Sequence, residues 1–109
     1  MKNGLVVDRY GTKRWHLNGK LHRTDGPAVE LADGEKQWHL NGKRHRIDGP
    51  AVEYDDENKA WFLNGELHRV DGPAIEFASG YLVWCLNGER LNCTTQEEFE
   101  QLMRLKSFL

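Results

Sequence analysis

The chain lacks the features on which several functional classes depend. Its 109 residues contain two cysteines, no block of like charge, and no apolar run near the ~20 residues that a membrane-spanning helix requires. Fifteen Lys+Arg against seventeen Asp+Glu give a net charge of −2, which excludes the basic stripe of a duplex-binding protein. The first residues hold too short an apolar stretch, residues 5–7, for a signal peptide. We therefore expect a cytoplasmic protein without a membrane span or a duplex nucleic acid partner.

Residue patterns typical of catalysis are also missing. There is no nucleophile elbow and no glycine-rich phosphate loop, and neither cysteine has a distinctive motif around it. Cys85 and Cys93 could pair, but two reduced thiols are the simpler interpretation for an intracellular chain. We expect no catalytic residue, no cofactor and no enzymatic activity.

What the chain does contain is a repeat. Tryptophans stand at positions 15, 38, 61 and 84, one every 23 residues, and open the phrases WHLNGKLHRTDGPAVE, WHLNGKRHRIDGPAVE, WFLNGELHRVDGPAIE and WCLNGERLNCTT. A fixed period of this length is typical of a repeat protein, in which each unit stacks on its neighbours. We predict a single domain, 1–109. Its parts are a leading half-repeat 1–14, full repeats 15–37, 38–60 and 61–83, a truncated repeat 84–93 and a capping helix 95–109.

Each repeat predicts two β-hairpins. Asn41-Gly42 is a strong signal for a two-residue turn, because both central positions of a type I′ turn need positive φ. This turn predicts three facing pairs: Leu40 with Lys43, His39 with Arg44, and Trp38 with His45. Asp33-Gly34 predicts a second two-residue turn, with two further pairs: Leu31 with Lys36, and Val29 with Trp38.

Alternation along these strands predicts one apolar and one wet face. The apolar face collects Val29, Leu31, Trp38, Leu40 and His45. The wet face collects Ala28, Glu30, Gln37, His39 and Arg44. The proline of the repeated Asp-Gly-Pro should kink the chain between hairpins. The expected fold is mainly β, a single twisted antiparallel meander sheet of about nine short strands, with a C-terminal capping α-helix.

Two segments depart from the repeat. Residues 55–58 replace the Asp-Gly turn of the other units, which predicts a looser loop with Asn58 in the left-handed conformation. After the last repeat, Thr95 and Glu98 form a capping-box pattern that predicts the start of a helix. Its apolar side comprises Phe99, Leu102, Met103, Leu105, Phe108 and Leu109. The helix either caps the end of the sheet or covers its apolar face.

The recurring histidines do not predict a metal site. Equivalent positions lie two strands apart, about 9.5 Å, so His22, His45 and His68 cannot share one zinc ion. Leu91 takes the fourth equivalent position, so we expect these histidines to stack on tryptophan and to hydrogen-bond to the aspartate three residues on. A second row, His16 and His39, becomes Phe62 and Cys85 in later units, which indicates tolerant surface positions.

The repeat also contains a row of glutamates, Glu30, Glu53 and Glu76. This row predicts a solvated face with salt bridges.

The tryptophan row is the candidate interaction surface. Four tryptophans carry roughly 600–1,000 Å² of ring surface, more than a monomer usually exposes. The helix can shield about half of the sheet, so a residual groove or a dimer seam is expected. The candidate surface comprises Trp15, Trp38, Trp61, Trp84, His22, His45, His68, Arg23, Arg46 and Arg69.

The pattern W-x-L-N-G-x-x-H-x-x-x-G over roughly residues 5–93 resembles the MORN repeat. Arginine stands where that family has glycine after the histidine, a variant similar to repeats in uncharacterised phage and large-virus proteins and in MORN-like bacterial antitoxins. The resemblance implies an elongated β-sheet with a binding or scaffolding role and no catalytic residues. We expect a non-enzymatic protein-interaction module, phage- or mobile-element-encoded and acting on a host protein, or an antitoxin, with a protein partner or a second copy in a homodimer. The alternative is a groove for a nucleotide, lipid head group or sugar, with the arginines as anion contacts.

Overall fold

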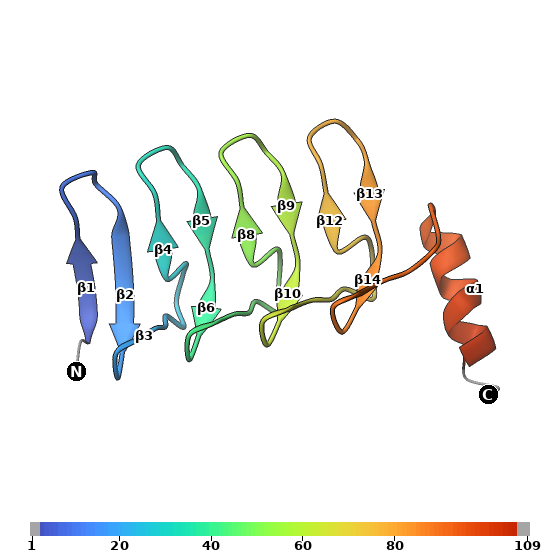
Figure 1. Cartoon of the computed structure of the whole chain (residues 1–109), viewed down its shortest axis with the longest axis horizontal. Helices are drawn as coiled ribbons and strands as arrows, with labels where there is room; N and C mark the ends of the chain where they lie inside the picture. The colour runs from blue at the N-terminus through green and yellow to red at the C-terminus, as the bar shows by residue number, and fades with distance from the viewer. Residues whose placement is uncertain (1–2, 107–109) are drawn as a thin grey trace.

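The computed structural model describes residues 3–106 and has the predicted class, a mainly β structure with one C-terminal helix. The molecule is elongated, with extents of 50 × 30 × 19 Å, and its hairpins stand side by side along the long axis (Figure 1). All strand pairs are antiparallel, and the main sheet has nine strands. They are β1 (Gly4–Val7), β2 (Lys13–Leu17), β3 (Lys20–Leu21), β4 (Val29–Glu30), β5 (Lys36–Gln37), β8 (Val52–Glu53), β9 (Lys59–Ala60), β12 (Ile75–Glu76) and β13 (Leu82–Val83).

The Asn-Gly hairpins of the later units form separate two-stranded ladders beside the main sheet. They pair β6 (His39–Leu40) with β7 (Lys43–Arg44), β10 (Phe62–Leu63) with β11 (Glu66–Leu67), and β14 (Cys85–Leu86) with β15 (Glu89–Arg90). The predicted register is confirmed: His39 faces Arg44 and Leu40 faces Lys43. Both turn residues have positive φ, 51° at Asn41 and 83° at Gly42, as a type I′ turn requires.

The register predicted for the Asp33-Gly34 hairpin is wrong by one residue. Glu30 faces Lys36 and Val29 faces Gln37, so Leu31 does not pair with Lys36 and Val29 does not pair with Trp38. The turn runs from Leu31 to Glu35, whose carbonyl accepts the Leu31 N–H at 2.9 Å, and only Gly34 has positive φ. A longer loop closed by one left-handed glycine is as compatible with Asp-Gly as a two-residue turn.

Because of this one-residue shift and a break in the strand at each tryptophan, the side chains do not alternate between an apolar and a polar face as predicted. The Trp38 N–H donates to the Ala51 carbonyl at 2.7 Å, and its carbonyl accepts the His45 N–H at 3.1 Å. Trp38 therefore bonds to the main-sheet side and to the small hairpin at once, and the chain turns at this residue. Neighbouring residues that alternation assigns to opposite faces, such as Ala28 and Val29, are both buried. The buried small residues are Ala28, Val29, Ala51, Val52, Ala60, Ala74, Val83 and Cys85.

The loop at residues 55–58 is not looser than its counterparts, which corrects the prediction. The Tyr54 N–H donates to the Asn58 carbonyl at 2.9 Å, in the same pattern as the turn of the preceding unit. The left-handed residue is Glu57, with a φ of 72°, and not Asn58. Glu57 occupies the position of Gly34, so the neighbouring units impose the turn geometry on a residue poorly suited to it.

Replacing Glu57 by glycine is expected to raise the free energy of unfolding by about 1 kcal/mol, because glycine adopts positive φ without the steric cost that a Cβ brings. Urea denaturation measures the change. Glu57→Ala is the matched control, since it removes the carboxylate but keeps the Cβ. An equal gain in both variants would contradict the backbone explanation.

The helix α1 (Gln96–Lys106) begins where the sequence predicts, and residues 107–109 of the predicted range lie outside the described residues. The Thr95 hydroxyl accepts the Glu98 N–H at 3.1 Å and so caps the first turn. Phe99 is buried with 2% of its surface exposed, whereas Leu105 is 64% exposed. The helix lies beyond the last hairpins at the end of the array (Figure 1). At 1.5 Å per residue its 11 residues span about 16 Å, well short of the ~30 Å thickness of the bilayer hydrocarbon. No helix in the described part of the chain could cross a membrane.

Candidate interaction groove

The arginines of the repeat stack on the tryptophans. The guanidinium carbon of Arg46 lies 3.8 Å from the centre of the Trp38 ring. The same contact measures 3.9 Å for Arg23 on Trp15 and for Arg69 on Trp61. Stacking of a guanidinium on an indole is among the stronger cation–π arrangements. The sequence analysis expected histidines to stack on these rings and did not predict the arginine contacts.

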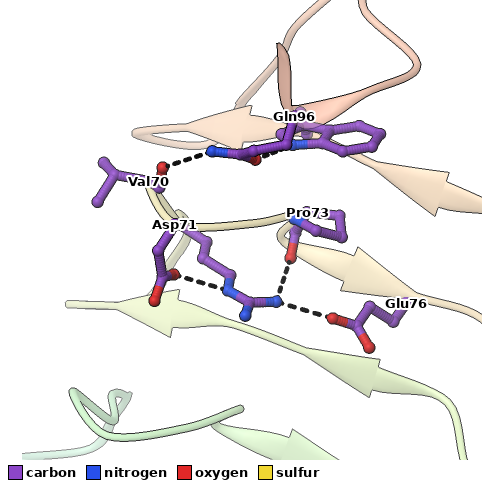
Figure 2. Close-up of polar contacts among 7 residues, drawn as sticks. Val70, Asp71, Pro73, Glu76 and Gln96 are labelled. Carbon is purple, nitrogen blue, oxygen red and sulfur yellow. Dashed lines mark hydrogen bonds and ion pairs between the residues drawn. The ribbon is translucent and has the colours of Figure 1, made fainter. Parts of the chain in front are cut away.

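Each of these guanidinium groups is also bonded in its own plane. The Arg46 Nε donates to Asp48 at 3.1 Å, while its Nη1 donates to the Pro50 carbonyl at 3.1 Å and to Glu53 at 2.9 Å. Figure 2 shows the equivalent bonds to Asp71, Pro73 and Glu76 in the next unit. An anion bound to these arginines would have to compete with two carboxylates already in place.

The salt bridges predicted for the glutamate row are present, because Glu53 and Glu76 each pair with the arginine of their unit and Glu30 lies 3.6 Å from Arg23. Two of the aspartate partners, Asp25 and Asp71, have a lowered pKa. The hydrogen bond from Arg23, and then its charge, lowers the pKa of Asp25 below its usual value. Arg69 has the same leading effect on the pKa of Asp71.

The glycine of Asp-Gly-Pro leaves room for the arginine. A Cβ at Gly49 would lie 2.9 Å from the Arg46 guanidinium carbon, and one at Gly72 would lie 2.6 Å from that of Arg69. Both distances are below van der Waals contact. Turn geometry, which explains the Asn-Gly pairs, does not explain these glycines. The guanidinium is therefore held between an indole ring and a bare glycine backbone.

The histidines of the candidate surface join one unit to the next. The His22 Nδ1 accepts the Asn41 backbone N–H at 2.9 Å, and the His45 Nδ1 accepts that of Asn64 at 3.0 Å. His68 does the same for Asn87 at 3.0 Å. The expected bond to the aspartate three residues on is thus replaced by a bond to the following unit. At the fourth position Leu91 keeps only the backbone bond, from its N–H to the Trp84 carbonyl at 2.8 Å.

Two positions of the second histidine row are buried, and the other two, His16 and Phe62, are half-buried. His39 is 7% exposed and Cys85 is 3% exposed, so the prediction of tolerant surface positions is wrong. The His39 Nε2 lies 3.1 Å from the Gln37 side-chain oxygen, but its Nδ1 is buried with no hydrogen-bond partner among the described residues. Burial lowers the pKa of His39, and the Arg44 cation adds to this effect.

Because the folded state disfavours a charged His39, the protein is expected to lose stability as the pH falls from about 7.5 to about 5.5, through the ordinary pKa of histidine. Above that range His39 is neutral in both the folded and the unfolded state, so its titration no longer lowers the free energy of unfolding. His39→Phe, the residue that the next unit carries at position 62, should lose less over the same range. Thermal unfolding at both pH values measures the difference, and equal losses in the two proteins would contradict it.

The cysteines are free thiols, Cys85 buried and Cys93 partly exposed. Burial raises the pKa of the Cys85 thiol, which keeps it protonated and weakly nucleophilic. Within residues 3–106, no three metal-ligating side chains come together.

A hollow of about 490 Å³ opens between the first and second units. Its lining includes Trp38 and Arg46 from one unit and Thr24 and Arg23 from the unit before. Ile47 lies at the same hollow with 85% of its surface exposed, and the equivalent Val70 is 61% exposed. The repeat therefore places an exposed apolar side chain beside a tryptophan–arginine pair.

The last unit differs because the helix closes it. Trp84 is 2% exposed, and Asn92 stands where the other units have the stacking arginine. The Trp84 indole N–H donates to the Gln96 side-chain oxygen at 2.8 Å, and the Gln96 amide donates to the Val70 carbonyl at 3.1 Å. The sequence reasoning missed Gln96, because a single polar residue at a helix start carries no signal of its partners.

Comparisons of this chain with protein-family models, with curated proteins and with solved structures found no match.

Proposed function

We propose that the chain is a non-enzymatic protein-binding module, which presents its row of tryptophan–arginine pairs, with the hollow at Trp38, to a protein partner. The observation that carries this proposal is the hollow at Trp38 with Ile47 beside it, 85% exposed. Aromatic and arginine side chains in a recess, flanked by an apolar contact, are typical of the residues that dominate protein interfaces.

Rigidity of the groove supports the same proposal. The Arg46 guanidinium is fixed by three hydrogen bonds and by the Trp38 ring, so little side-chain freedom remains to be lost when a partner binds. The resemblance of the motif to MORN repeats agrees with a binding role. Within this proposal the partner is a host protein of a phage or mobile element, a toxin held by its antitoxin, or a second copy of the chain.

Selection from a random peptide display library tests the proposal. Peptides enriched on the wild-type protein should bind Ile47→Asp at least about tenfold more weakly, because the substitution places a charge on the apolar rim. The matched control is Ser79→Asp, which adds the same charge at an exposed turn position where the two preceding units already carry aspartate. Light scattering at two concentrations shows whether a second copy competes for the surface.

Failure to enrich any peptide would overturn the proposal. Binding that Ile47→Asp and Ser79→Asp weaken equally would do the same, because the groove would then have no special part in it.

A further inference from the structure

The last unit provides a template for the groove, because the chain fills that groove with one of its own side chains. Gln96, the first residue of α1, lies between the Trp84 indole N–H and the Val70 carbonyl and bonds to both. Figure 2 shows the Gln96 amide reaching toward Val70, above the arginine contacts of the preceding unit.

These two partners select the chemistry of what can bridge them. An indole N–H can only donate a hydrogen bond, and a backbone carbonyl can only accept one. A bridging group must therefore accept at one end and donate at the other, as a primary carboxamide does. A carboxylate would place an oxygen against the carbonyl, and an ammonium group has no acceptor for the indole.

The same pair of groups recurs in the two units before. Trp38 and Thr24 are the counterparts of Trp84 and Val70, and both line the hollow of about 490 Å³. One unit further on, the counterparts are Trp61 and Ile47. Among residues 3–106, the structure gives no hydrogen-bond partner to these two indole N–H groups or to the two carbonyls. For Trp15 the corresponding carbonyl belongs to residue 1, outside the described residues.

One difference limits what the upstream grooves can take. The last unit has Asn92 where Arg46 and Arg69 stack on their rings, at 3.8 and 3.9 Å. The guanidinium occupies the ring face, so a ligand reaches the nitrogen edge of the indole with a short polar head and not with a large apolar group. At the hollow that Trp38 lines, Ile47 offers an exposed apolar contact to the remainder of the partner.

We propose that the grooves at Trp38 and Trp61 each bind the side-chain amide of a glutamine at the start of a helix in a partner protein. The amide oxygen accepts from the indole N–H, and the amide nitrogen donates to the carbonyl of Thr24 or Ile47. This inference rests on the proposed protein-binding function and specifies its recognition chemistry. The helix α1 is the internal example, since its own first residue makes both bonds in the last unit.

The test uses the full chain labelled with ¹⁵N, in which each indole N–H gives a separate NMR signal. The probe is a synthetic peptide with the sequence of residues 94–106, compared with the same peptide carrying Gln96→Leu. The glutamine peptide should shift the Trp38 and Trp61 signals with saturation in the millimolar range, and the leucine peptide should bind about tenfold more weakly or not at all.

A matched protein variant locates the site. Trp38→Phe keeps an aromatic ring for Arg46 but removes the indole N–H, so the peptide should no longer shift the backbone amide signals of Thr24 and Asp25 and should still shift the Trp61 indole signal. Because phenylalanine keeps most of the ring, the variant is expected to fold.

Three results would overturn the inference: no shift with either peptide, equal shifts with both, or a shift confined to Trp84. If peptides from the display selection still bind in a way that depends on Ile47, the proposed protein-binding function is supported and only the carboxamide recognition is wrong. If neither experiment finds a ligand, the proposed function itself fails.

Discussion

Replacing Trp84 by alanine is expected to lower the free energy of unfolding by about 3–5 kcal/mol, the usual cost of emptying a fully buried aromatic site. Trp84 is 2% exposed, and its indole N–H is bonded to Gln96. The substitution therefore leaves both a cavity and an unpaired Gln96 amide oxygen between the last repeat and α1. Guanidinium denaturation followed by circular dichroism measures the loss.

Trp84→Phe separates the two contributions, because it fills most of the cavity but cannot donate to Gln96. We expect it to cost about 1–2 kcal/mol, the range for leaving a polar group without its partner plus a small packing defect. A loss below about 1 kcal/mol for Trp84→Ala would contradict the burial of Trp84 in a packed core.

Replacing Arg46 by methionine is expected to cost about 2–3 kcal/mol. The change removes the stack on Trp38 and the bonds to Asp48, Pro50 and Glu53. The Arg46 side chain is only 21% exposed, so these contacts are screened less than surface ion pairs are. Lysine should restore little of the loss, because an ammonium group cannot stack as a plane, and its three N–H donors radiate from one nitrogen and cannot reproduce bonds made from both Nε and Nη1.

Urea denaturation of Arg46→Met, Arg46→Lys and a control measures this effect. Lys43→Met removes the same charge from an exposed position on β7 and should change stability by less than about 0.5 kcal/mol. If Arg46→Lys were as stable as the wild type, charge alone would account for the arginine row, and the stacked geometry would be incidental.

The turn residues were the sequence pattern that predicted the local structure best. The period of the tryptophans gave the repeat, and Asn41-Gly42 gave the register of its hairpin, because a two-residue turn admits one pairing. Asp33-Gly34 did not, since it is compatible with two loop lengths that differ by one residue. That single residue moved Leu31 out of its predicted pair.

Contacts between units could not be predicted from the pattern within one unit. Glu57 has a left-handed φ because its neighbours on both sides make the same turn, a constraint that lies outside its own segment. The sequence likewise does not indicate that His45 bonds to the next unit or that Arg46 stacks on Trp38. Residues at equivalent positions make contacts with the neighbouring unit, and the spacing of residues along the chain does not indicate those contacts.

The bonds from each histidine to the next asparagine have a consequence for how such a chain can change length. Each unit makes the same connection forward that it receives from behind, through His22, His45 and His68 in turn. Loss or duplication of one whole unit would leave every remaining connection with an equivalent partner. Recombination between near-identical units can therefore lengthen or shorten the protein without a new core having to arise, and it adds or removes one groove each time.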